Sequence, residues 1–184
     1  DHWRSSAVLS VAPAADGSLW IGTEGGGVYR LQQGVIAHLP PSERIWQAVA
    51  NSVLEDRRGR LWVGTWSSGL RYLENDEFQP AYAASAGRNV VLSVFEARAG
   101  DIWVGTRGGA GRLQAGAWKW FDDVSALRTA TVRCFAEEAD GTIWCGLDGS
   151  GVVRLGATGA QQLRAADGLA GDHVRALLAE ADGT

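Results

Sequence analysis

The chain has 184 residues, of which 46% are hydrophobic and nine are tryptophan, a length sufficient for one domain with a sizeable core. Its net charge of −4 and the lack of a basic cluster argue against nucleic acid as a partner. No apolar run reaches membrane-spanning length and no signal peptide is recognisable, so we expect no direct membrane contact by this segment.

A short motif containing tryptophan recurs along the chain. Its first copy is Asp16-Gly17-Ser18-Leu19-Trp20-Ile21-Gly22-Thr23, and later copies begin at Arg58, Ala99 and Asp140. The motif tryptophans Trp20, Trp62, Trp103 and Trp144 are separated by 42, 41 and 41 residues. Each copy combines a tight turn at its first glycine with a short apolar, β-branched run, which predicts a strand. The chain is therefore a periodic array.

Each repeat contains four segments of this kind. In the first repeat they begin at Val8, Leu19, Val28 and Val35. Four strands of about six residues with four connections of about four residues need about forty residues, which matches the period. A unit of this length and strand number is typical of a β-propeller blade. We therefore predict an all-β fold of four-stranded antiparallel blades.

The expected blades follow one another along a single propeller domain over residues 1–184. They cover residues 7–39, 48–82, 90–121 and 131–164. Residues 173–184 repeat only the first strand and its turn, which predicts a partial fifth blade with one extra inner strand. Because the chain also begins with a first strand, its two ends cannot complete each other. We expect a larger ring, completed by further blades or by a second copy of the chain.

Residues that recur in every repeat are interpreted as scaffold. We expect each motif tryptophan to pack between neighbouring blades, because an indole buries about 150–250 Å². The glycine two residues after it leaves room for a neighbouring backbone or ring. The third strands each carry an arginine, which we expect at one structural position: Arg30, Arg71, Arg112 and Arg154.

The two cysteines fall on adjacent predicted strands of the fourth repeat. Counting from the turn at Gly141 places Cys134 near Leu147 and Cys145 near Ala136. The thiols would then lie diagonally, which favours two reduced core residues over a disulfide.

The repeat is seen best from Ala50 to Leu70, where it follows the pattern Val-x-Ser-Val-x-Glu-Asp-x-x-Gly-x-Leu-Trp-Val-Gly-Thr-x-x-x-Gly-Leu. This pattern resembles the two-component regulator propeller repeat, and Asp167–Leu177 resembles that family's blade junction. The resemblance implies an extracytoplasmic, usually periplasmic, sensor region of a bacterial hybrid or simple sensor histidine kinase. It also implies a saccharide ligand, since the members of that type whose role is understood sense saccharides.

Ligand contacts are expected where the repeats differ, on connections that one end of the blades gathers together. This end carries the connections from second to third strand and from one blade to the next. The candidate binding residues there are Trp46, Trp66, Arg88, Asn89, Arg107, Arg128 and Asp148. An indole can stack on a sugar ring while the polar side chains bind its hydroxyls, which fits an oligosaccharide or another small polar ligand. The structural alternative is that Trp46 and Trp66 fill loops or touch the adjoining blade.

Two other functions stay open at this point. One is a non-catalytic scaffold that completes its ring by oligomerising, and the other is a propeller lyase or hydrolase. His2, His38 and His173 are scattered, and none is paired with a nucleophile motif. The sequence has no zinc-ligand spacing and no EF-hand calcium loop. We therefore expect no catalytic residue, no metal and no cofactor in this segment.

Overall fold

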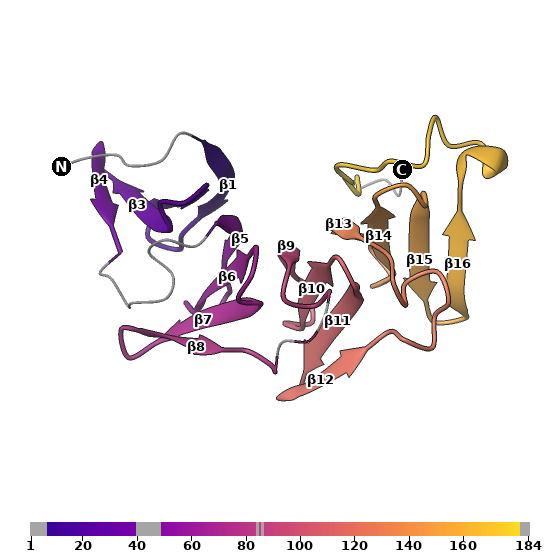
Figure 1. Cartoon of the computed structure of the whole chain (residues 1–184), viewed down its shortest axis with the longest axis horizontal. Helices are drawn as coiled ribbons and strands as arrows, with labels where there is room; N and C mark the ends of the chain where they lie inside the picture. Colours follow the sequence, from indigo (N-terminus) through magenta and orange to yellow (C-terminus); the bar gives the residue numbers. More distant parts are fainter. Residues whose placement is uncertain (1–6, 40–48, 84, 86, 181–184) are drawn as a thin grey trace. The chain divides into compact units, whose positions relative to one another are not determined.

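The structure is a computed structural model that describes residues 7–39, 49–83, 85 and 87–180. It contains two compact units, Asp1–Val94 (unit 1) and Phe95–Thr184 (unit 2). Strands make up most of the described part of each unit (Figure 1).

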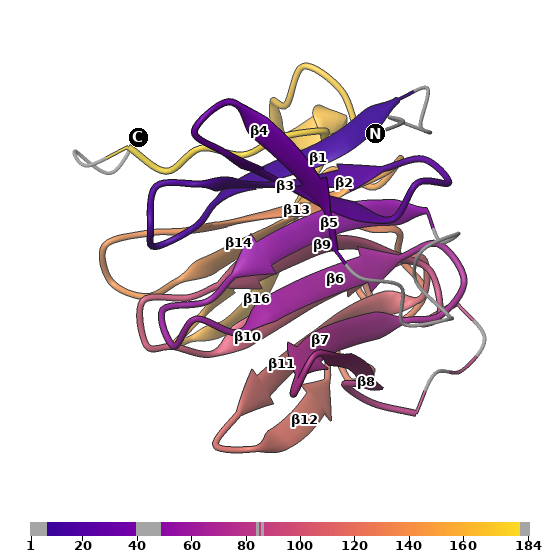
Figure 2. The same ribbon diagram turned by 90° about the vertical axis from the view of Figure 1, so that its left-hand side faces the viewer.

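The described chain is almost entirely β-strand, and four consecutive strands form each sheet. Each sheet is one blade of a β-propeller segment, as predicted. Blade 1 comprises β1 (Val8–Pro13), β2 (Leu19–Thr23), β3 (Val28–Gln32) and β4 (Val35–His38). Blade 2 comprises β5 (Ala50–Glu55), β6 (Leu61–Thr65), β7 (Leu70–Glu74) and β8 (Glu77–Pro80). The strands of blade 2 lie side by side in chain order (Figure 2).

The two later blades repeat this order. Blade 3 comprises β9 (Val91–Glu96), β10 (Ile102–Thr106), β11 (Gly109–Gln114) and β12 (Ala117–Trp120). Blade 4 comprises β13 (Val132–Glu137), β14 (Ile143–Leu147), β15 (Val152–Gly156) and β16 (Gly159–Leu163). A single helical turn, η1 (Ala165–Asp167), follows blade 4. Among the described residues, no helix is long and apolar enough to cross a membrane.

The turn between the first two strands of each blade explains the recurring glycine. In blade 1, Gly17 has φ +84° and its N–H donates to the Ala14 carbonyl at 3.1 Å. A residue with a Cβ rarely adopts this conformation, so glycine is the favoured residue there. The carboxylate of Asp16 accepts from the Ser18 N–H at 3.0 Å, which fixes the exit of the turn.

The glycine before the end of each second strand is required by close packing between blades. A Cβ on Gly22 would lie 2.6 Å from the carbonyl oxygen of Ala50, on the next blade. A Cβ on Gly64 would lie 2.5 Å from Cγ1 of Val91. A hydrogen bond also joins the blades of unit 1, since the Val53 N–H donates to the Ser10 hydroxyl at 2.8 Å. The predicted close approach of neighbouring blades is confirmed.

The motif tryptophans are buried as predicted. Trp20, Trp62 and Trp103 are 6%, 2% and 3% exposed, and Trp144 is partly buried. In unit 1, Trp20 packs with the blade 2 residues Ala50 and Val53 and donates its indole N–H to Glu55 at 2.6 Å. In unit 2, the Trp103 ring lies 6.0 Å from the ring of Phe135 on blade 4. These tryptophans therefore bind neighbouring blades together.

One scaffold prediction is wrong: Arg71 does not occupy the position of the other third-strand arginines. Arg30, Arg112 and Arg154 each pair across the sheet with the motif tryptophan of their blade. In blade 2 that partner is Tyr72, and Arg71 instead faces Val63. The spacing from the bend glycine explains the difference. In the other three blades the arginine lies three residues after this glycine, whereas Arg71 lies only two residues after Gly69. Arg60 takes over the ring contact, with its guanidinium 5.6 Å from the Trp62 ring.

The predicted register of the cysteines is also off by one residue. Cys134 pairs with Gly146 and Cys145 with Phe135, because the ladder is centred on Asp140, as Glu137 paired with Ile143 shows, and not on the Asp140–Gly141 bond. A register shift follows beyond Cys134, between Val132 and Cys134. The same irregularity occurs near the start of β1 and β5. Both cysteines are free thiols, and burial raises the pKa of each.

The segment after η1 runs along the end of β14 without forming a strand. The Val174 N–H donates to the Leu147 carbonyl at 2.9 Å, and one isolated bridge joins His173 to Asp148. Val174 packs where a Cβ on Gly146 would be, as Val91 does at Gly64. Val174 thus takes the place of the first strand of a further blade, although the extra strand itself is reduced to a single bridge.

Candidate ligand-binding site

The connections predicted to share one end of the blades do so within each unit. The residue after β2, β6 and β14 donates its N–H to the segment that leads into the same blade: Glu24 to Ala7 at 3.0 Å, Trp66 to Val49 at 3.1 Å and Asp148 to Thr131 at 2.9 Å. The following bend bonds to the connection that leaves the blade, as in Gly69 N–H to Asn89 carbonyl at 2.9 Å. We call this end of each blade its loop face.

Unit 1 holds three of the predicted binding residues, all at the loop face of blade 2. Trp66 is 49% exposed, and Glu24, Arg107 and Asp148 take its place in the other blades. The Asn89 carbonyl accepts from the Gly69 N–H, in the bend that follows Trp66. The carbonyl of Arg88 accepts from the Tyr82 hydroxyl at 2.9 Å, which anchors the connection. Trp46, the other predicted aromatic residue, lies outside the described residues.

Arg71 joins this group, although the sequence interpretation assigned it to the scaffold. Its Nε–H donates to the Ser68 carbonyl at 3.1 Å, in the bend that follows Trp66. At this position blades 1, 3 and 4 carry Tyr29, Gly111 and Val153, so Arg71 is a feature of blade 2 alone. Aligning the third strands on their bend glycines would have shown that Arg71 occupies a different position from the other three arginines.

Unit 2 holds the other three predicted binding residues. Arg107 is exposed directly after β10, and the Arg128 Nε–H donates to the Asp122 carbonyl at 2.9 Å. The Gly109 N–H to Ala130 carbonyl bond, 2.9 Å long, joins the bend after Arg107 to the connection that carries Arg128. Asp148 belongs to blade 4. Among the six described candidates, bonds thus link the segments of Arg107 and Arg128, whereas Asp148 lies on a separate blade.

Asp148 already has strong protein partners. His173 Nδ1 lies 2.7 Å from one carboxylate oxygen, and the other oxygen accepts from both Nε (2.9 Å) and Nη2 of Arg133. The hydrogen bond from His173 and the Arg133 guanidinium lower the pKa of Asp148 from its usual 3.8 to about 2. The carboxylate therefore organises the loop face of blade 4, since it holds β13 and the segment after η1 together.

This pKa shift predicts how stability depends on pH. Because the folded-state pKa is depressed, the contribution of Asp148 is complete above about pH 4 and is lost as the pH falls toward about 2. The variant Asp148→Asn should melt at a lower temperature than the unmodified chain at pH 7. The difference should be constant down to about pH 4 and shrink between about pH 4 and 2. A melting difference that does not change over this interval would refute the assignment.

The described residues offer no group of three or more histidine, cysteine, aspartate or glutamate side chains arranged to hold a metal ion. The loop faces instead present one exposed indole, several arginines and a paired carboxylate. This chemistry suits recognition of a polar, uncharged or weakly acidic molecule by stacking and hydrogen bonds.

Comparison with known proteins identifies the repeat. A family model described as two component regulator propeller matches residues 2–25, 44–67 and 85–108. Each match runs from the connection before a blade to just beyond the end of its second strand. Three segments of the chain are therefore similar to the two component regulator propeller repeat. A search of curated proteins found no match to it.

Solved structures share the fold of these propeller repeats. The extracellular domain of the hybrid two component system BT3049 from B. thetaiotaomicron is 23% identical with a TM-score of 0.78, over 98% of this chain and 25% of that one. The extracellular domain of BT4673 from the same organism is 18% identical with a TM-score of 0.78, over 100% and 26%. Virginiamycin B lyase from Staphylococcus aureus is 12% identical with a TM-score of 0.66, over 85% and 55%. The chain spans about a quarter of the two extracellular domains, and at these identities the likeness concerns the fold.

Proposed function

We propose that this chain is a non-catalytic, ligand-sensing propeller segment of a bacterial two component sensor, located outside the cytoplasm. We propose further that the loop face of blade 2 binds a saccharide. The matched repeats and the fold shared with extracellular domains of two component systems support the sensor assignment. The fold shared with a lyase is the reason to test catalysis separately.

The observation that carries the saccharide proposal is the exposed ring of Trp66. The motif tryptophans of unit 1 are buried, whereas Trp66 is 49% exposed at the end of the blade where connections gather. Arg71 and Asn89 hydrogen-bond to the bend that follows Trp66, which brings further donors and acceptors to the same loop face. A rigid aromatic surface ringed by polar groups is the arrangement that stacks on a sugar and binds its hydroxyls.

Calorimetric titration with short neutral and acidic oligosaccharides tests the proposal. Trp66→Ala should weaken binding by about tenfold or more, because the stacking surface is lost. Trp118→Ala is the matched control, since Trp118 lies on the outer strand β12 and should leave the affinity unchanged. Turnover of an oligosaccharide by the unmodified chain would overturn the non-catalytic assignment.

A second candidate function is a scaffold that completes its ring with another copy or with further blades. Ala50 and Val53 of β5 are buried against blade 1, with 0% and 5% exposure. Their counterparts in β1, Val8 and Val11, are 49% and 55% exposed. Within the described part of unit 1, the face of β1 therefore has side chains suited to a blade contact, but no blade packs on it. A mass in solution above that of one chain, with no oligosaccharide bound, would favour the scaffold over the sensor.

A further inference from the structure

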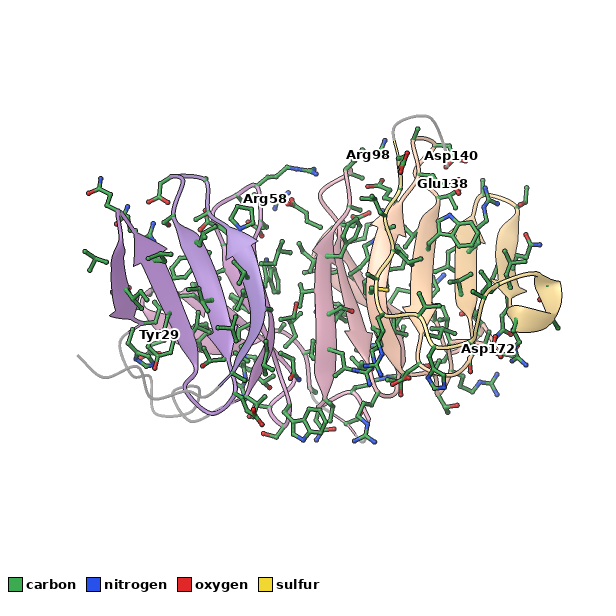
Figure 3. All side chains as sticks on the ribbon, turned by 90° about the horizontal axis from the view of Figure 1, so that it is seen from above. Tyr29, Arg58, Arg98, Glu138, Asp140 and Asp172 are labelled. Atoms are coloured by element: carbon green, nitrogen blue, oxygen red, sulfur yellow. The ribbon has the colours of Figure 1, made fainter. Side chains whose placement is uncertain are left out.

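A cavity in unit 2 lies at the end of the strands opposite the loop face. Its volume is about 590 Å³, and it is formed between blades 3 and 4. Its walls include the first turn of blade 4, at Asp140, and the β15–β16 turn. Figure 3 shows Glu138 and Asp140 at this end of the strands of unit 2 and Asp172 at the other end. The cavity is therefore separate from the candidate binding residues described above.

The indole of Trp103 lines this cavity and has an unsatisfied N–H. Trp103 is 3% exposed, and its Nε1 has no hydrogen-bond partner among the described residues. A buried donor without an acceptor costs free energy, so native proteins nearly always provide a partner. The ring itself is held firmly, stacked on Phe121 with the ring centres 5.1 Å apart.

The other three blades show what is missing at Trp103. The indoles of Trp62 and Trp144 donate to a carboxylate of their own blade, Asp56 at 2.8 Å and Glu138 at 2.5 Å. In blade 3 the same position is Ala97, which leaves the acceptor out and lines the cavity. Blade 3 thus lacks the carboxylate with which two other blades satisfy the indole N–H.

In blade 1 the acceptor for the indole N–H comes from the next blade, whereas in blade 3 it does not. Blade 1 also has an alanine at this position, Ala14, and the indole of Trp20 donates instead to Glu55 of blade 2. The counterpart of Glu55 in blade 4 is Glu137, which accepts from the Arg98 N–H at 2.7 Å just as Glu55 accepts from the Ala15 N–H at 2.9 Å. The Arg98 side chain also donates to the Glu137 carbonyl at 3.0 Å. Unlike Glu55, Glu137 makes no bond to the indole of the preceding blade, so the buried Trp103 N–H has no partner among the described residues.

The charges around the cavity restrict what could fill it. Four carboxylates line it, from Asp101, Asp123, Glu137 and Asp140, against two cations, Arg112 and Lys119. Arg112 is already paired with Asp101 at 2.5 Å. Glu137 and Asp140 also lie near cations outside the lining, Arg98 at 3.6 Å and Arg154 at 3.9 Å, so the local charges nearly balance and favour a neutral polar ligand. A hydroxyl group fits both kinds of neighbour, because its oxygen accepts from the indole and its hydrogen donates to a carboxylate.

We propose that this cavity is a binding site for a small neutral, hydroxyl-rich molecule, a polyol or a single sugar ring. One hydroxyl oxygen accepts from Trp103 Nε1–H, and other hydroxyls donate to the carboxylates of Asp123 and Asp140. The apolar walls, which include Phe121, Val124 and Leu155, pack against the carbon skeleton. This site does not depend on the proposed function of the loop face, because it uses different residues at the other end of the strands.

Nuclear magnetic resonance of the ¹⁵N-labelled chain tests the site directly. Each tryptophan contributes one indole N–H signal, and Trp103→Phe identifies the Trp103 signal by its disappearance. Glycerol, myo-inositol and D-glucose are titrated separately, so that an open-chain polyol, a cyclic polyol and a pyranose are distinguished. At least one should move the Trp103 signal in a saturable way. If none does, the proposal is wrong.

Three variants separate binding from folding. Trp103→Phe keeps the ring stack on Phe121 and should weaken binding of the effective probe by about three- to tenfold, the effect of one lost hydrogen bond. Trp144→Phe is the matched control, since its indole N–H already donates to Glu138, and should leave the affinity unchanged. Ala97→Asp should supply the missing acceptor and abolish binding. Unaltered affinity in Trp103→Phe or in Ala97→Asp would overturn the proposal, whatever Trp66→Ala does to oligosaccharide binding.

Discussion

Replacing Trp62 by alanine should lower the free energy of unfolding by about 3–5 kcal/mol. Trp62 is 2% exposed, and its ring lies 5.5 Å from that of Tyr72 and 5.6 Å from the guanidinium of Arg60. The truncation removes this packing, opens a cavity between strands that are otherwise close-packed, and leaves the Asp56 carboxylate without its indole donor. Urea denaturation followed by circular dichroism measures the loss.

Trp66→Ala is the matched control for this experiment. It deletes the same side chain four residues later on the same blade, at a position that is 49% exposed. We expect a loss below about 1 kcal/mol, because solvent already surrounds much of the ring. If the two variants lost equal stability, the motif tryptophan would not be the packing residue of the blade.

The elements that depend on local chemistry could be predicted from the sequence. The turn at Gly17 needs a positive φ, and the strand at Trp20 needs residues that can be buried on both faces. The glycine and the apolar run therefore predict the turn and the strand in each repeat. The register was harder to predict. The shift between Val132 and Cys134 inserts one residue without altering the apolar pattern, and only the hydrogen-bond ladder reveals it.

The candidate sites were less predictable, because they depend on how repeats differ in three dimensions. Trp66 could be identified from the sequence as a candidate because the other repeats have no aromatic residue at its position. Arg71 was misassigned because residue type was aligned instead of the distance from Gly69. The unsatisfied N–H of Trp103 could not have been predicted. The sequence alone does not show that a carboxylate at the position of Ala97 would reach the indole. That relation appears only when Asp56 and Glu138 are seen to bind Trp62 and Trp144.

Replacing Asp56 by alanine should lower the free energy of unfolding by about 2–4 kcal/mol. Asp56 is 7% exposed and its carboxylate accepts three hydrogen bonds, from the N–H groups of Arg58 (3.0 Å) and Arg60 (2.9 Å) and from Trp62 Nε1 (2.8 Å). The carboxylate therefore closes the turn and satisfies the buried indole at the same time. Asp140→Ala is the control, because Asp140 bonds the Thr142 N–H in an exposed turn without reaching the tryptophan, and it should cost less than about 1 kcal/mol.

A double-mutant cycle with Trp62→Phe isolates the part of this loss that belongs to the indole. Phenylalanine keeps most of the ring and removes the donor, so Asp56→Ala should cost about 1–2 kcal/mol less in the Trp62→Phe background than in the unmodified chain. Purely additive losses would mean that Asp56 acts only on the turn. A clear coupling would show that a carboxylate at this position stabilises a blade by accepting from its tryptophan, and Ala97 supplies no such acceptor to Trp103.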